Sequence, residues 1–175
     1  MRNYRYSDDI NSLVDELISK GYKELDNVAS LGIKNTKVFA SVDGNIATIT
    51  SKHNRYELIY RQVKPIDKGD NRTEYRIAIE NKKHPVHKII ALTYPEFTGK
   101  WDETLDIHHL DCNHLHNEAT NLICVTKEIH VKIHSLLKKA QDTQVMMNRI
   151  NTYLFACNIN DEDITIEGLE ELIYG

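Results

Sequence analysis

His130 and His134 lie four residues apart in a predicted helix, residues 127–140, with Thr126 as its N-cap and Glu128 in its first turn. Side chains four positions apart on a helix project from one face, about one turn apart. This spacing suits two imidazole ligands of one cation. For this pair taken alone, the alternative is a surface helix with incidental histidines.

A second histidine pair, His108 and His109, stands at the end of a short predicted strand, residues 104–108. A polar loop rich in His and Asn, residues 109–120, separates it from another predicted strand, residues 121–126. A hairpin of these two strands can bring the pair against the helix, so that three ligands and a fourth, non-ligating base converge. The adjacent pair and the strand–turn–strand–helix order favour a metal site over incidental histidines.

This segment resembles the HNH nuclease family, with its ββα-metal fold. The matching residues are His108, His109, Asn121 at the opening of the second strand, His130 and His134. Upstream, the stretches FASVDGNIATI and VHKIIALTYPEF resemble phage and intron-borne HNH homing endonucleases. Together the resemblance covers roughly residues 37–136.

The resemblance implies a role for each matching residue. His109 would be the general base that takes a proton from the attacking water, a task suited to a group that titrates near neutrality. Asn121 would brace the loop and help to keep the His109 ring oriented, through hydrogen bonds to the backbone. The metal ligands would be His108, His130 and His134.

One divalent ion is implied as the cofactor. It would polarise the scissile phosphate and stabilise the leaving 3′ oxygen, giving 3′-hydroxyl and 5′-phosphate ends. Many homing members have Asp in place of His108 and Asn in place of His130. Mg²⁺ or Mn²⁺ is expected, with Zn²⁺ and Ni²⁺ as alternatives because this chain offers nitrogen where those relatives offer oxygen.

Other polar residues surround the predicted site. Asp106 and Asp111 flank the histidine pair and could contribute a ligand or orient a histidine. His114 and His116 in the loop are interpreted as polar loop or phosphate-contact residues, with an incidental role favoured. His87 is interpreted as a structural histidine.

The net charge of −4 is the main fact against a nucleic-acid enzyme, because phosphate binding usually leaves a basic footprint. The distribution of charge reduces that objection. Residues 51–101 contain eleven Lys/Arg and six Asp/Glu. Residues 127–149 contain five Lys/Arg and two Asp/Glu. The middle of the chain is therefore basic.

Double-stranded DNA is the expected partner. On the sheet segments a solvated charged surface is a nearly equal alternative to DNA binding, whereas the lysines of the histidine helix are better candidates because the cleaved strand must pass there. The predicted DNA-binding residues are Lys127, Lys132, Lys138, Arg72, Arg76, Lys82, Lys83 and Lys88.

The pattern predicts an α+β fold: a small antiparallel sheet leading into a ββα-metal (HNH) motif, with flanking N- and C-terminal helices. Ser7 is the predicted N-cap of the first helix, and the first two helices are expected to pack rather than to read DNA. Asp43-Gly44-Asn45 is a strong turn signal. The predicted elements outside the motif are helices 8–20 and 24–31, two strands within 38–50, strands 55–63 and 73–80 separated by a polar loop through Pro65, a turn at Pro85, and helices 86–94, 141–157 and 165–173.

Three regions are expected: an N-terminal helical segment (1–36), an HNH nuclease domain (37–140, with its ββα-metal core at 104–140) and a C-terminal helical extension (141–175). The three cysteines form no C-x-x-C pair, which argues against cysteine-bound zinc and against disulfides. With no signal peptide and no apolar run long enough to cross a bilayer, the expected location is the cytoplasm of a bacterial host cell, for a phage-encoded protein.

The function predicted from these features is a metal-dependent DNA endonuclease, phage-associated and either a homing or nicking enzyme or a restriction-type cutter. A palindromic target would be met most simply by a homodimer. The alternative function is a non-catalytic DNA-binding or partner-binding protein on an HNH scaffold. The complete set of motif residues counts against that alternative.

Overall fold

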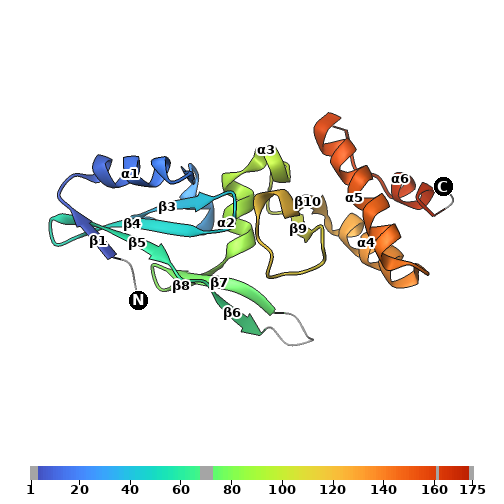
Figure 1. Cartoon of the computed structure of the whole chain (residues 1–175), viewed down its shortest axis with the longest axis horizontal. Coiled ribbons are helices and arrows are strands. Elements are labelled where there is room, and N and C mark those ends of the chain that lie inside the picture. The colour runs from blue at the N-terminus through green and yellow to red at the C-terminus, as the bar shows by residue number, and fades with distance from the viewer. Residues whose placement is uncertain (1–3, 68–72, 161, 174–175) are drawn as a thin grey trace.

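The computed structural model describes residues 4–67, 73–160 and 162–173. Figure 1 shows an elongated arrangement, with a sheet-rich N-terminal part and a helical C-terminal part on either side of α2 and α3. The elements are β1 (Tyr4–Ser7), α1 (Ile10–Ser19), β2 (Tyr22–Glu24), η1 (Val28–Leu31), β3 (Thr36–Ser41), β4 (Ile46–Lys52), β5 (Arg55–Arg61), β6 (Lys64–Asp67), β7 (Thr73–Ile79), β8 (Lys82–Pro85), α2 (Val86–Thr93), α3 (Pro95–Thr98), β9 (Leu105–His109), η2 (Ala119–Asn121), β10 (Leu122–Thr126), α4 (Lys127–Lys139), α5 (Thr143–Asn160) and α6 (Ile166–Glu171). The expected mixture of helices and antiparallel sheets is confirmed.

The first sheet has the strand order β1-β5-β4-β3-β2. Helix α1 packs on one face of it, because Leu13 and Leu17, four positions apart, contact a buried cluster that includes Phe39 and Leu58. The N-cap of α1 is Asp9, whose carboxylate accepts a hydrogen bond from the backbone of Asn11 at 2.9 Å. The prediction of Ser7 as the cap was wrong, because Ser7 is the last residue of β1.

Three predicted features of this region differ in the structure. The predicted helix 24–31 is instead strand β2, paired with β3, followed by the short 3-10 helix η1. The predicted loop through Pro65 contains β6, and the predicted turn at Pro85 ends β8. Both pair with β7 in a second sheet, β6-β7-β8. Proline is tolerated there because β6 and β8 are edge strands that need fewer backbone donors.

Helix α2 joins the two sheets to the C-terminal part. Its buried residues Ile89 and Ile90 share one apolar cluster with Ile79 of β7 and Leu122 of β10. The β3–β4 turn reaches the same region, since the backbone N–H of Ala119 donates to the carbonyl oxygen of Val42 at 2.8 Å. The strand β9 is therefore anchored against elements from both halves of the chain.

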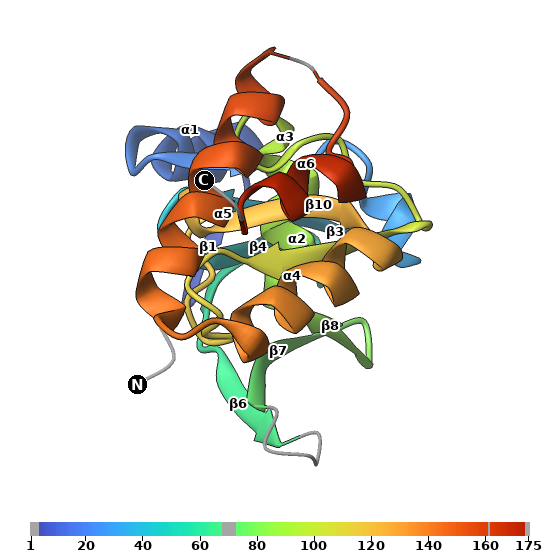
Figure 2. The ribbon, with the colours of Figure 1, turned by 90° about the vertical axis from the view of Figure 1, so that its right-hand side faces the viewer.

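Strands β9 and β10 form an antiparallel hairpin in which His108 pairs with Ile123 and His109 with Leu122. Helix α4 follows directly, and the hydroxyl of Thr126 caps it by accepting from the backbone of Ile129 at 3.2 Å, as predicted. Figure 2 shows α5 and α6 stacked around α4 and the hairpin. No helix in the described ranges is long and apolar enough to cross a membrane.

Candidate functional site

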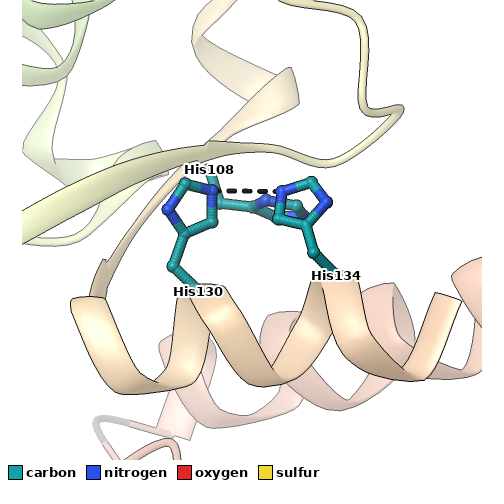
Figure 3. A group of neighbouring side chains, drawn as sticks. All are labelled: His108, His130 and His134. Carbon is teal, nitrogen blue, oxygen red and sulfur yellow. Dashed lines mark hydrogen bonds between the residues drawn. The ribbon is translucent and has the colours of Figure 1, made fainter. Parts of the chain in front are cut away.

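Three histidines from two elements meet between β9 and α4. His108 comes from the strand, and His130 and His134 come from successive turns of the helix (Figure 3). One ring nitrogen from each lies within 4.8 Å of the others. The Nε2 atoms of His130 and His134 face each other at 3.2 Å. The structure thus brings together all three predicted metal ligands.

Burial favours the neutral, metal-binding form of His108 and His134. His108 is only 2% exposed, and its Nδ1 has no hydrogen-bond partner among the described residues. Burial, followed by the neighbouring His130 and His134, lowers the pKa of His108 to about 3. Burial also lowers the pKa of His134. Three imidazoles with clustered ring nitrogens and one unpartnered buried nitrogen fit a divalent cation.

Asp106 fixes the orientation of one of these rings. Its Oδ2 accepts a hydrogen bond from Nδ1 of His130 at 3.0 Å. Nδ1 thus donates to Asp106, and the other ring nitrogen, Nε2, is the one that contacts Nε2 of His134. A carboxylate behind a histidine in this way orients metal ligands in many sites.

His109 points away from the three-histidine group. It is 2% exposed, and its Nε2 lies 3.3 Å from Oδ1 of Asn117. The rings of His87 and His114 meet it edge-on, with centroids 5.5 and 5.0 Å away. Burial, followed by repulsion from His87, lowers the pKa of His109 to about 4. The ring is therefore neutral at physiological pH.

Asn121 braces the loop between the strands through side-chain and backbone hydrogen bonds. Its Nδ2 donates to Oδ1 of Asp111 and to the carbonyl oxygen of His116, each at 2.9 Å. Its own carbonyl oxygen accepts from the backbone of Leu110 at 2.9 Å. The side chain that contacts His109 directly is Asn117, which the sequence did not single out.

His109 and His130, one member of the three-histidine group, border a common pocket of about 500 Å³. His114 and His87, which the sequence suggested were incidental or structural, are also on its wall. The lining residues are Thr73, Glu74, Arg76, His87, Asp106, Ile107, His109, His114 and His130. Strand β7 therefore forms one side of the site, although β8, α2 and α3 separate it from β9 in the chain.

The predicted DNA-binding residues have different surroundings. Arg76 lines the site pocket, whereas the ammonium group of Lys88 stacks over the Trp101 ring at 4.1 Å. Lys132 forms an ion pair with Glu170 of α6. The remaining ones are Lys127 and Lys138, exposed on α4, Lys82 and Lys83, exposed on β8, and Arg72, which lies outside the described residues.

One family model matches the part of the chain that contains most of this site. Residues 85–132 match the family model described as HNH endonuclease, a span that contains His108, His109, Asn121 and His130. The predicted resemblance to the HNH family is confirmed over this span, which is less than half of the chain.

Comparison of structures gives one more distant likeness. The fold is similar to a structure described as "DNA binding and cleavage by the HNH homing endonuclease I-HmuI", with a TM-score of 0.44 and 20% sequence identity. The similarity covers 70% of this chain and 62% of that one, so this chain spans less than two thirds of that protein's length. No curated protein matches the chain in sequence.

Proposed function

We propose that this protein is a metal-dependent DNA endonuclease that hydrolyses phosphodiester bonds, with His109 as general base and one divalent ion held by His108, His130 and His134. One observation carries the proposal: the buried, neutral His109 borders the same pocket as His130, one member of the three-histidine group. Together with the HNH endonuclease match over residues 85–132, this arrangement favours hydrolysis over binding alone. The phage-associated homing, nicking or restriction role expected from the sequence remains part of the proposal.

The hydrogen bonds of Asn117 indicate which ring nitrogen of His109 carries the proton. Its Nδ2 donates to the carbonyl oxygen of Leu115 at 3.2 Å, so its Oδ1 faces His109 and must accept from Nε2. The Nδ1 lone pair, buried and without a partner among the described residues, is then the proton acceptor for the attacking water. A neutral ring can take that proton, whereas an imidazolium could not.

A divalent ion in the three-histidine group would supply positive charge beside the scissile phosphate. The chain's own contribution is to hold three imidazoles at one point, with Asp106 orienting the His130 ring from behind. Nitrogen ligands favour Mn²⁺, Ni²⁺ or Zn²⁺ over Mg²⁺, which prefers oxygen. Assays with Mg²⁺ alone would therefore be an incomplete test.

Plasmid cleavage tests the proposal. Supercoiled DNA is incubated with the protein and Mg²⁺, Mn²⁺, Ni²⁺ or Zn²⁺, with EDTA as the blank, and nicked and linear products are separated on a gel. We expect cutting by the wild type with at least one ion, and a loss of about 100-fold or more in His109→Ala. The control His53→Ala removes an exposed histidine of the β4–β5 turn and should cut normally. A wild type that is inert with every ion, or an active His109→Ala, contradicts the proposal.

Calorimetry tests the ligand set independently of cleavage. We expect His130→Ala and His134→Ala to weaken the binding of Mn²⁺ or Ni²⁺ sharply while circular dichroism stays that of the wild type. Asp106→Asn should weaken it by roughly 10- to 100-fold, because it acts through His130. Unchanged affinity in both histidine variants would remove them from the ligand set.

The alternative function is DNA or partner binding without catalysis on the same scaffold. The presence of His108, His109, Asn121, His130 and His134 counts against it, because a decayed site is expected to lose the base first. Tight DNA binding by a protein that loads metal but cuts with none of the four ions would favour this alternative.

A further inference from the structure

A second cavity of about 500 Å³ lies between the two sheets. One wall is the end of β5 with β1, and the other is the β6-β7-β8 sheet, which extends from the first sheet toward the hairpin along the lower side of Figure 1. We call this cavity the inter-sheet groove. The described residues that line it are Tyr4, Ile59, Tyr60, Arg61, Gln62, Lys64, Pro65, Ile66, Arg76, Ile77, Ala78 and Lys83.

The groove is basic on both walls. Among its described lining residues there are four Lys/Arg and no Asp or Glu, although the whole chain has a net charge of −4. Arg61 lies on the β5 wall, where its Nε donates to the hydroxyl of Thr48 at 2.7 Å. Lys64 and Lys83 belong to the opposite wall and are exposed.

Sheet register places the cations of the second wall on one face. Lys64 is directly paired with Arg76, and Ala78 with Lys83. Paired residues of antiparallel strands point to the same face, and so do residues two apart on β7. Lys64, Arg76 and Lys83 therefore share one face. Ala78 lies among them with a short, exposed side chain that leaves space beside Lys83.

Arg76 borders both cavities, the groove and the histidine pocket. Its Nε donates to Oε1 of Glu74 at 2.5 Å, and Glu74 lines the histidine pocket only. Within the described ranges no hydrogen bond or ion pair engages the two Nη groups of Arg76. Glu74 thus fixes the guanidinium while leaving its forked end available to an anion.

We propose that the inter-sheet groove binds the phosphate backbone of the DNA strand next to the bond that is cut, with Arg76 at the junction between groove and histidine pocket. The inference rests on the proposed function, because that function makes DNA the substrate. A strand leaving the histidine pocket along β7 meets Arg76 and then the lysines, and a row of cations in an open groove suits a chain of phosphates.

Fluorescence anisotropy with a labelled DNA duplex tests the groove without cleavage. Binding is measured in EDTA over a series of salt concentrations for the wild type and two variants. One is Lys64→Ala/Lys83→Ala. The other is Ala78→Glu, which adds an acid to the groove while keeping every cation. The matched control is Lys37→Ala/Lys100→Ala, which removes the same charge from exposed lysines outside the groove.

We expect both groove variants to bind at least about tenfold more weakly than the wild type near 0.1 M salt. The slope of log K against log salt should fall by about 2 in Lys64→Ala/Lys83→Ala, because each phosphate contact contributes about 0.9. The control should keep the wild-type slope, and inorganic phosphate at millimolar concentration should not compete. Circular dichroism confirms folding of each variant.

Wild-type affinity and slope in both groove variants would overturn the inference, and so would equal losses in the control. Competition by millimolar phosphate would also overturn it in favour of a small-anion site. The outcome is separable from the proposed function. If the wild type binds DNA through the groove but cuts with no ion, the nuclease proposal fails and the groove stands. If the wild type cuts DNA while both groove variants bind DNA normally, the groove inference fails and the nuclease proposal stands.

Discussion

At the scale of single residues, Asn117 and His87 are the neighbours that set the state of His109. Asn117 bonds to its Nε2, and the His87 ring packs edge-on against it. Neither contact is encoded by a recognisable spacing, since Asn117 lies eight residues beyond His109 in an irregular loop and His87 lies on α2. They follow from tertiary packing, which explains why the sequence drew attention to His109 but not to its contacts with these two residues.

Asn117 is expected to act as a positioning residue for His109. Asn117→Ala should lower kcat for DNA cleavage by about tenfold, with little change in KM, because a free ring presents its lone pair in the right direction less often. Asn117→Asp keeps the accepting oxygen and should recover part of the rate. It should also move the acidic limb of the pH–rate profile to higher pH, because a carboxylate beside His109 stabilises the imidazolium and raises the pKa of that ring. A purely structural role would change thermal stability and leave that profile in place.

The buried histidines predict a dependence of stability on pH. Burial lowers the pKa of His87 to about 4, below its ordinary value of 6.5. Between these values the unfolded chain binds more protons than the folded one, so stability is complete above about pH 6.5 and is lost as the pH falls toward 4. For His87 the loss is on the order of 3 kcal/mol at most.

Urea unfolding in EDTA at several pH values measures this effect. His87→Leu should reduce the slope of stability against pH, because the substitution removes a buried group that must stay neutral. His53→Gln, at an exposed turn, should not. Equal slopes in the wild type and His87→Leu would mean that folding does not shift the pKa of His87.

At the scale of elements, the β3–β4 turn supports the loop that carries Asn117. Gly44 in this turn has φ +84°, and a Cβ added there would lie 2.9 Å from the carbonyl oxygen of Asn117. The sequence predicted the turn from Asp43-Gly44-Asn45 but not what it touches. A glycine is required both by the backbone angle and by the closeness of the loop.

Gly44→Ala is expected to destabilise the protein more than Gly21→Ala. Gly21 has a similar φ of +78°, but a Cβ added there would meet open space, so that only the left-handed strain applies. The added clash at Gly44 should cost roughly a further 1–3 kcal/mol and should lower cleavage by shifting Asn117. Thermal unfolding of the two variants makes the comparison. Equal losses of stability would show that the loop carrying Asn117 moves away from the added Cβ at no energetic cost.

The elements differ in how far the sequence could predict them. The β9–β10–α4 unit was predictable because the i, i+4 spacing of His130 and His134 and the Thr126 cap are local rules. The strands β2, β6 and β8 were missed because each is only three or four residues long and depends on its partner strand. Short edge strands carry little pattern of their own.

At the scale of the whole molecule, one apolar core crosses the predicted domain boundary at residue 140. Ile133 and Leu136 of α4 pack in the same buried cluster as Ile150 and Leu154 of α5 and Leu169 of α6. The helix that carries two of the three clustered histidines is therefore covered by the C-terminal helices. An acidic residue of α6 also contacts α4, since Glu170 forms an ion pair with Lys132.

Two adjacent residues of α5 test whether this extension stabilises the histidine helix. Leu154 is 0% exposed and Phe155 is 42% exposed. Leu154→Ala should cost about 2–5 kcal/mol in unfolding free energy, and Phe155→Ala roughly 1 kcal/mol or less. Chemical denaturation measures both. Similar small losses would mean that the C-terminal helices add little to the stability of the nuclease region.

His108 and His109 are consecutive residues of β9, and this order has a consequence for the stereochemistry of cleavage. Because neighbouring residues of a strand point to opposite faces, His108 contacts His130 and His134 while His109 contacts His87 and His114. A phosphodiester bound between them would be attacked on the His109 side and would release its leaving oxygen on the other. We therefore expect inversion of configuration at phosphorus, which cleavage of a chiral phosphorothioate in isotopically labelled water would reveal.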